Sequence, residues 1–141
     1  MNILKIKTEK RTLGNFGEAA AAKFLRRAGY KILERNYVSD EGEIDIICCD
    51  KKVMAFVEVK TRTVGKESPL EARPASAVTK EKQRKLARCA AFYGAYYGRG
   101  YQLRLDVIEV LVEDSGGRRR ISEIKHLVGA FDRSDAFSRG Y

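Results

Sequence analysis

The chain has few of the residues that commonly build metal centres and disulfide frameworks. Its 141 residues include one histidine, His126, and three cysteines, Cys48, Cys49 and Cys89. No two cysteines form a CxxC pair, so this set argues against a structural zinc site. Cys48 and Cys49 are neighbours on a predicted strand and point to opposite faces, so they cannot readily pair with each other. We therefore expect reduced thiols and a cytoplasmic location.

Long hydrophobic runs are also absent. No segment approaches the ~20 apolar residues that a membrane-spanning helix needs, so we expect no membrane span. Residues 1–5 contain neither a long apolar run nor a cleavage site, and we expect no secretion signal. With 44% apolar and 33% charged residues, the composition is that of a globular protein. The length suits one domain with a real core rather than two domains.

Negative charge is in the minority. Lys and Arg outnumber Asp and Glu by 28 to 19, which gives a formal net charge of +9. Such an excess favours polyanionic partners, nucleic acid first and an anionic membrane surface second. General solubility is the simpler explanation of the same number. The choice of partner therefore has to come from the motifs.

Hydrophobic periodicity and turn residues predict one α/β domain over residues 12–128, with a central mixed β-sheet flanked by helices. Residues 1–11 are polar and basic and are expected to form a flexible arm, and residues 129–141 an irregular tail. Thr12 supplies a helix cap and Gly29 a helix stop. A long loop is expected over 61–76. The expected helices are 12–28 and 79–97, and the expected strands are 30–37, 43–49, 53–60, 103–112 and 121–128.

Two adjacent predicted strands carry an unusual set of charges. They read Gly42-Glu43-Ile44-Asp45-Ile46-Ile47 and Phe56-Val57-Glu58-Val59-Lys60. A two-residue turn at Lys51-Lys52 would pair them so that Asp45 faces Glu58 and Glu43 faces Lys60. All the charges then fall on one face and all the aliphatic side chains on the other, which supports this register. Directly opposed residues have Cβ atoms ~4.5–5.5 Å apart, so we expect the two acids to be close.

Close carboxylates repel each other unless a positive charge lies between them. Mg²⁺ or Mn²⁺ would supply that charge, and since Mg²⁺ keeps several waters, two or three protein oxygens suffice. A metal there can activate water and stabilise charge on a phosphodiester, with Lys60 orienting the water or stabilising the phosphate. The same residues also fit a plain cross-strand ion network with a Glu43–Lys60 pair and a solvated Asp45. Surface pairs of that kind are common and weak.

Glu18 lies in the first predicted helix among small residues that would let the helix approach a sheet closely. Without other observations it is more simply an ordinary surface glutamate. The chain as a whole, however, resembles the YraN family of predicted bacterial endonucleases over roughly residues 12–112. The resemblance is carried by an ordered set of motifs: Gly17-Glu18-Ala19-Ala20, Gly29-Tyr30, Arg35-Asn36-Tyr37, Gly42-Glu43-Ile44-Asp45, Phe56-Val57-Glu58-Val59-Lys60-Thr61-Arg62, Lys82-Gln83-Arg84-Lys85-Leu86 and Arg104-Leu105-Asp106-Val107-Ile108.

The resemblance implies a restriction-endonuclease-like fold with the PD-(D/E)xK signature, similar to archaeal Holliday-junction resolvases. By that resemblance Asp45, Glu58 and Lys60 are the catalytic trio, and Glu18 is a further catalytic acid and metal ligand. The implied ligands of Mg²⁺ or Mn²⁺ are Asp45, Glu58, Glu18 and the carbonyl of Val59. Ile44 stands where the signature has proline, a departure that leaves Asp45 in place. Because such resolvases act as dimers, a homodimer is also implied.

The second predicted helix is strongly basic. A basic helix beside a metal site would hold DNA phosphates without reading sequence, although a solvated helix face explains the pattern equally well. Tyr93, Tyr96 and Tyr97 could stack on bases, but at this spacing most are expected to be core or half-buried. Arg104 and Asp106 are expected to form a structural ion pair. The candidate nucleic-acid-binding residues are Arg62, Lys80, Lys82, Gln83, Arg84, Lys85 and Arg88.

Two functions follow from these observations. The first is a Mg²⁺- or Mn²⁺-dependent endonuclease, a hydrolase of phosphodiester bonds in DNA, with branched or otherwise structured DNA as a candidate substrate. The second is a non-catalytic nucleic-acid-binding module of the same fold, and the intact acids and lysine argue against it. A basic scaffold for a protein or membrane surface has no amphipathic membrane helix to support it.

Overall fold

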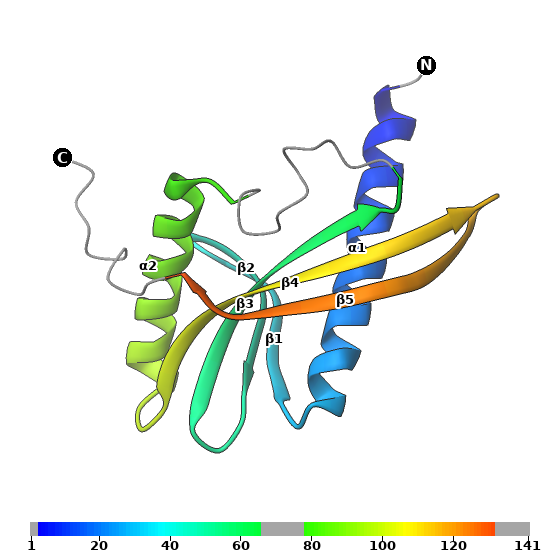
Figure 1. Ribbon diagram of the computed structural model, residues 1–141. Coiled ribbons are helices and arrows are strands. Elements are labelled where there is room, and N and C mark those ends of the chain that lie inside the picture. The colour runs from blue at the N-terminus through cyan, green and yellow to red at the C-terminus, as the bar shows by residue number, and fades with distance from the viewer. Residues whose placement is uncertain (1–2, 66–77, 132–141) are drawn as a thin grey trace.

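A twisted five-stranded sheet forms the centre of the molecule (Figure 1). The computed structural model describes residues 3–65 and 78–131. The strands lie in sequence order, and neighbours are antiparallel except for β3 and β4, which are parallel because helix α2 (Lys80–Tyr97) crosses between them. The sheet is therefore mixed, and the predicted α/β class is confirmed. The strands are β1 (Lys31–Ser39), β2 (Gly42–Cys49), β3 (Val53–Thr63), β4 (Gln102–Ser115) and β5 (Arg118–Phe131).

The two helices cover opposite faces of the sheet, as Figure 1 shows. Helix α1 (Ile3–Arg27) packs Ala21, Ala22 and Leu25 against one face, and α2 packs Leu86 and other side chains against the other face. Because both faces are covered, the central strands are apolar on both sides rather than alternating. The core consequently consists of two layers with the sheet between them.

Helix α1 begins at Ile3, nine residues before the predicted start at Thr12. Most of the expected arm is therefore helical, because residues 3–11 contain good helix formers and neither Gly nor Pro. The predicted stop is confirmed: Gly29 has φ +98°, and the Tyr30 N–H donates to the Leu25 carbonyl at 3.0 Å. At the other end, β5 continues to Phe131, three residues beyond the expected boundary. Residues 132–141 of the expected tail and 66–77 of the loop lie outside the described residues.

The predicted register of the β2–β3 hairpin is confirmed over four pairs, from Ile46 opposite Val57 to Cys49 opposite Met54. Its turn is held by Asp50, whose Oδ1 accepts hydrogen bonds from the backbone N–H groups of Lys52 and Val53, both at 2.7 Å. Such Asx-type bonds explain why an aspartate precedes a two-residue turn.

The predicted pairing of Asp45 with Glu58 is wrong, because the ladder ends at Ile46 and Val57. Beyond that pair β2 stays bonded to β1, with Ile44 opposite Tyr37, and β3 stays bonded to β4. The two strands thus separate where the acids begin. The expectation of one aliphatic face is wrong for the same reason: Ile44 packs in the layer under α2, whereas Ile46 and Val57 pack under α1.

A buried polar cluster ties β4 and β5 to the start of β1. Asp106 is fully buried and accepts hydrogen bonds from Arg104 (2.9 and 2.8 Å) and from the Gly129 N–H (2.9 Å). His126 Nε2 lies 2.8 Å from Asp106 Oδ2, and Arg104 also donates to the Tyr30 hydroxyl at 2.7 Å. The predicted Arg104–Asp106 pair is therefore confirmed.

Candidate active site

Helix α1 comes unusually close to β3 at Gly17. A Cβ atom built there would lie 1.9 Å from Thr61 Oγ1, a distance that no side chain could tolerate without a shift of Thr61. Glycine therefore permits the close approach, and it brings the next residue, Glu18, against the sheet. Only 7% of Glu18 remains exposed, so it is not an ordinary surface glutamate.

Asp45 lies at the point where β2 and β3 separate. Its Oδ2 accepts a 2.7 Å hydrogen bond from the backbone N–H of Val59, which takes the place of a ladder bond between the strands. Burial and the negative charge of Glu58 raise the pKa of Asp45 to about 7, despite the Val59 hydrogen bond. Asp45 is therefore a carboxylate whose charge the protein alone balances poorly.

Glu18 is held beside Asp45 by an arginine from β1. Arg35 Nε lies 3.4 Å from Glu18 Oε1, yet that buried oxygen accepts no hydrogen bond from the described part of the chain. Burial raises the pKa of Glu18, and the charge of Arg35 offsets this only in part. Glu18 Oε1 thus has an ion-pair partner but no hydrogen bond among the described residues.

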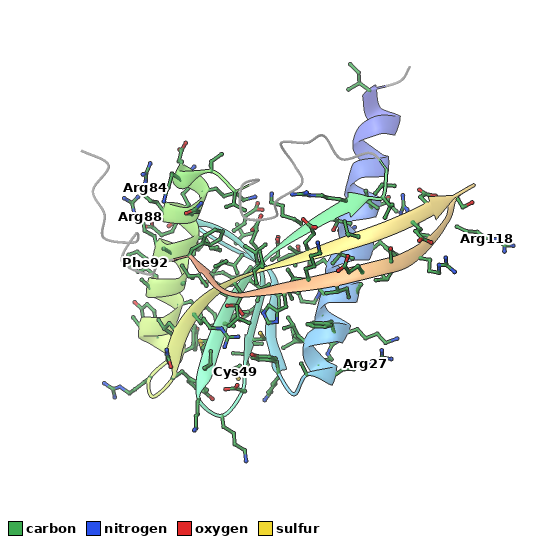
Figure 2. All side chains as sticks on the ribbon, in the orientation of Figure 1. Arg27, Cys49, Arg84, Arg88, Phe92 and Arg118 are labelled. Carbon is green, nitrogen blue, oxygen red and sulfur yellow. The ribbon has the colours of Figure 1, made fainter. Side chains whose placement is uncertain are left out.

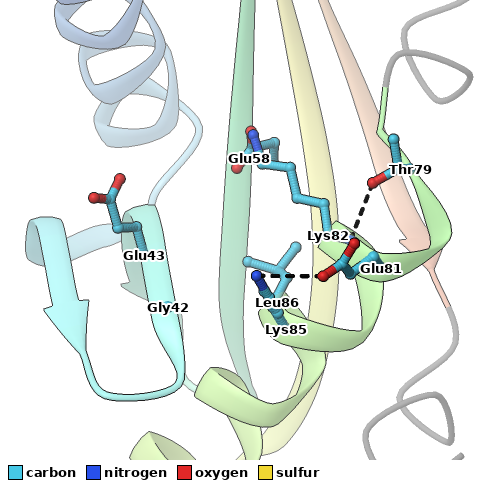
Figure 3. Close-up of a pocket in the computed structure, with 8 residues that line it drawn as sticks. All are labelled: Gly42, Glu43, Glu58, Thr79, Glu81, Lys82, Lys85 and Leu86. Carbon is cyan, nitrogen blue, oxygen red and sulfur yellow. Dashed lines mark hydrogen bonds and ion pairs between the residues drawn. The ribbon is translucent and has the colours of Figure 1, made fainter. Parts of the chain in front are cut away.

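Glu58 is almost buried and points toward α2, where Lys82 reaches it (Figure 3). Lys82 Nζ lies 2.6 Å from Glu58 Oε1, and Lys60 Nζ lies 3.5 Å from the same oxygen. Although burial lowers the pKa of Lys82, the contact with Glu58 outweighs it, and the net shift is upward. For Lys60 burial dominates and the pKa is lowered, with Glu58 opposing the shift. One carboxylate oxygen is thus shared by two ammonium groups.

These residues line two hollows, one bordered by Lys60 and the other by Glu58, whose side chains contact each other at 3.5 Å. The first, of about 540 Å³, is called the acid hollow here; Asp45, Glu18, Val59, Lys60 and Thr61 are among its lining residues. The second, of about 360 Å³, is called the lysine hollow, and its lining includes Glu58, Glu43, Lys82 and Lys85. Within residues 3–65 and 78–131 no three acidic, histidine or cysteine side chains are grouped as a metal-ligand set in their present orientations. Glu58 is directed to the two lysines, although its charge still acts on Asp45.

The alternative explanation, a cross-strand ion network with a Glu43–Lys60 pair, does not describe the site. Lys60 is paired with Glu58, and Glu43 is exposed at the mouth of the lysine hollow (Figure 3). Asp45 is half-buried and accepts a hydrogen bond from the Val59 N–H rather than being fully solvated. The charges therefore form a partly buried cluster, in which electrostatic effects are larger than at a fully exposed surface.

The candidate nucleic-acid-binding residues have different surroundings. Arg62 is nearly buried, with its Nε 3.3 Å from Glu109 Oε2, and the Gln83 amide donates to the Val78 carbonyl at 2.9 Å. Both placements favour structural roles. Lys82 contacts Glu58, and Lys85 is exposed and 3.6 Å from Glu81. The remaining candidates, Lys80, Arg84 and Arg88, are at least partly exposed on α2.

Neither the contact of Arg35 with Glu18 nor that of Lys82 with Glu58 was predictable from the sequence. Arg35 belongs to the Arg35-Asn36-Tyr37 motif, and Asn36 has φ +52°, a conformation in which Asn is enriched. The Asn next to Arg35 was therefore the sequence signal that β1 is irregular at this point. Lys82 had no such signal, since its position depends on how α2 crosses the sheet.

Comparison with known proteins places the chain in a family. A family model described as "Uncharacterised protein family UPF0102" matches residues 17–110. A UPF0102 protein of Chlorobium phaeobacteroides is 41% identical over 121 residues, covering 84% of this chain and 93% of that protein. One of Caldanaerobacter subterraneus is 40% identical over 126 residues, covering 89% and 98%, and one of Chlorobaculum parvum is 44% identical over 126 residues, covering 87% and 94%.

The chain belongs to the UPF0102 family, and its resemblance to the YraN family is thereby confirmed. The matched region contains Glu18, Asp45, Glu58, Lys60 and Lys82. In the described part of the chain, neither helix is apolar enough to cross a membrane.

Proposed function

We propose that this protein is a metal-dependent endonuclease that hydrolyses phosphodiester bonds in DNA. The observation that carries the proposal is the half-buried Asp45, whose pKa is raised to about 7 by desolvation and by the charges of the buried Glu58 and Glu18. A protein keeps such unbalanced acids together where a function uses them, because burial of like charges opposes folding. The neighbouring lysines and the net charge of +9 suit a polyanionic substrate.

The donor set fits Mg²⁺ or Mn²⁺. These ions prefer carboxylate and carbonyl oxygens, and Mg²⁺ usually retains several waters, so few protein ligands are needed. Asp45 and Glu18 both line the acid hollow, and Glu18 Oε1 accepts no hydrogen bond among the described residues. Asp45, Glu18, the Val59 carbonyl and Glu58 would hold the cation. When bound, such a cation stabilises charge on the phosphate and activates water.

The chain's own residues have separate tasks in this proposal. The Val59 N–H fixes the Asp45 carboxylate by a 2.7 Å hydrogen bond to Oδ2, so Oδ1 is the oxygen that would bind the cation. Lys60 lines the same hollow and is positioned by Glu58, so its ammonium can neutralise charge on a phosphate that enters there. Arg35 keeps Glu18 in place at the wall.

Lys82 is expected to compete with the metal for Glu58. Replacing it in Lys82→Met removes the ammonium 2.6 Å from Glu58 Oε1, and hydrogen bonds to charged groups contribute about 1.5–3 kcal/mol. We expect the variant to bind Mn²⁺ about tenfold more tightly in calorimetry without DNA. The matched control is Lys85→Met on the same helix, because Lys85 pairs with Glu81. Unchanged or weaker Mn²⁺ binding by Lys82→Met would contradict this role.

The direct test of the proposal is cleavage of DNA. The purified protein is incubated with branched, single-stranded and duplex DNA in Mg²⁺ or Mn²⁺, and products are resolved by electrophoresis. We expect cleavage that a chelator abolishes and that Glu58→Gln reduces about 10²-fold or more, because charge stabilisation by a metal site amounts to several kcal/mol. Glu81→Gln, an exposed acid at the start of α2, is the control. Equal activity of wild type and Glu58→Gln would refute the assignment.

One observation favours a second function, a non-catalytic nucleic-acid-binding module. The 2.6 Å Lys82–Glu58 contact would serve that module by neutralising Glu58 permanently. It would show DNA affinity that falls steeply with salt, together with no cleavage and no calorimetric Mn²⁺ binding.

In either case we place the protein in a reducing cytoplasm, since Cys48, Cys49 and Cys89 are free and buried. A homodimer stays a prediction.

A further inference from the structure

Helix α2 changes character halfway along its length. The first half carries Lys80, Lys82, Arg84, Lys85 and Arg88 with one acid, Glu81, and the second half carries no charge. The second half nevertheless has an exposed aromatic surface: Phe92 is 57% exposed, Tyr96 81% and Tyr97 66%. Arg84, Arg88 and Phe92 all point away from the sheet along one side of the helix (Figure 2). With Tyr96, they repeat at intervals of four residues and so form one stripe.

The exposed ring of Tyr97 packs on a buried aromatic ring. Tyr97 lies against Tyr93, with ring centroids 4.7 Å apart. Tyr93 is buried, contacts Phe56 and Tyr37 edge-to-face at 6.0 and 5.2 Å, and donates a hydrogen bond to Glu34 at 3.2 Å. Aromatic rings therefore run from the core to the surface, and the outermost ring needs little ordering before another flat ring stacks on it.

We propose that this outer face of α2, the α2 stripe of Arg84, Arg88, Phe92, Tyr96 and Tyr97, binds a single-stranded segment of the nucleic-acid substrate. Arginines contact backbone phosphates and the aromatic rings stack on unpaired bases, the combination by which proteins hold single strands. Bases inside a duplex are already stacked and hidden from such rings. The inference rests on the proposed function, and it makes that function selective for DNA with an unpaired stretch beside the cleaved bond.

The location of the stripe supports this assignment. Lys82 and Lys85 of the first turns line the lysine hollow beside Glu58, and Tyr96 lies 14 residues farther along α2, roughly 21 Å at the helical rise. A strand that leaves the active site along α2 would meet basic residues first and aromatic rings next.

The chain offers a direct reporter for base stacking, because it contains no tryptophan. Tyr96→Trp places a single indole on the stripe, and Ile3→Trp places one at a similarly exposed site, 68% exposed, at the far end of α1. Both are made in the Glu58→Gln background and measured in a chelator, so that cleavage cannot interfere. We expect oligo(dT) to quench the fluorescence of the indole at position 96 and leave that at position 3 unchanged. Blunt duplex of the same length should quench position 96 only weakly.

Affinity measurements separate the two halves of the stripe. By fluorescence anisotropy with labelled oligo(dT), the double substitution Phe92→Ala and Tyr96→Ala should weaken binding roughly 5- to 100-fold, with duplex affinity unchanged. Arg84→Gln and Arg88→Gln should each reduce the salt slope by about 0.7. Arg118→Gln, on the exposed hairpin tip seen in Figure 2, is the charge control and should change neither.

The outcomes are distinguishable from failure of the nuclease proposal. If oligo(dT) quenches the indole at position 96 but the wild type cleaves no DNA, single-strand binding by the stripe is supported and the nuclease proposal is refuted. Cleavage without quenching, or equal quenching by duplex and single strand, would overturn the inference alone. Sedimentation that shows a dimer lost in the Phe92→Ala and Tyr96→Ala protein, with unchanged DNA affinity, would also overturn it and make the stripe a self-association surface.

Discussion

Asp45→Asn is expected to abolish cleavage and at the same time to stabilise the fold. The amide keeps the size of the carboxylate and can still accept the hydrogen bond from Val59, but it is a poor metal ligand and carries no charge. Loss of a metal ligand removes several kcal/mol of charge stabilisation, so we expect a fall in cleavage rate of roughly 10³-fold. The gel assay with Mn²⁺ measures it directly. Glu43→Gln, on the same strand but exposed, should retain full activity.

The stabilising effect of Asp45→Asn should depend on pH. The ordinary pKa of Asp is 3.8, and in the folded protein the pKa of Asp45 is raised to about 7. Between these values the folded state binds more protons than the unfolded state, so the stability of the wild type falls as the pH rises from about 4 to 7. At pH 8 the variant should therefore be more stable by about 2 kcal/mol, and at pH 4 the two should be nearly equal.

Thermal unfolding at the two pH values checks this prediction. Mn²⁺ should raise the melting temperature of the wild type and leave that of Asp45→Asn almost unchanged, because a ligand stabilises only a fold that binds it. A variant that is less stable than the wild type at pH 8 would show that the protein itself balances the Asp45 charge. A variant that responds to Mn²⁺ as the wild type does would show that Asp45 does not hold the metal.

Asp106→Ala is expected to destabilise the protein more than any surface substitution. It removes the acceptor of four contacts and leaves the Arg104 guanidinium and His126 without their partner. Removing one member of a buried ion pair costs about 3–5 kcal/mol, a large share of the 5–15 kcal/mol that typically stabilises a domain. Urea unfolding followed by circular dichroism measures the loss. Glu123→Ala, an exposed acid on β5, should change stability by no more than about 0.5 kcal/mol.

The pH dependence of Asp106 has the opposite sign to that of Asp45. Burial raises the pKa of Asp106, but hydrogen bonds from His126, Arg104 and Gly129 together outweigh it and lower the pKa below 3.8. Its contribution is therefore complete above pH 4 and is lost as the pH falls through the lower folded value. Wild type and Asp106→Ala should converge in stability in acid. A difference that grows on acidification would contradict this account.

Local chemistry made much of the fold predictable. The register of the β2–β3 hairpin followed from a two-residue turn, and Asp50 indeed holds that turn. The helix predicted over 79–97 is observed as α2, and its cap, Thr79, accepts from the Lys82 N–H at 3.1 Å, whereas the predicted cap Thr12 lies inside α1. Gly29 ends α1 because only glycine readily adopts its positive φ. Each of these features depends on residues within a few positions in the sequence.

The site was less predictable because its geometry arises from packing between distant elements. The separation of β2 from β3 after Ile46 and Val57 reflects helices on both faces and strand twist, which alternation of side chains does not encode. Lys82 reaches Glu58 only because the crossover returns α2 over the sheet. The sequence indicated which charges gather, whereas the tertiary structure determined which of them touch.

The crossover between the parallel strands β3 and β4 has a consequence for the timing of activity during synthesis. The acids occur early in the chain, but β3 acquires its second neighbour only after α2 and β4 have been made. A partly translated chain would carry Asp45 and Glu58 without the scaffold that aims them. With the proposed chemistry, a nascent chain gains its DNA-cleaving activity only after α2 and β4 have been made and have left the ribosome.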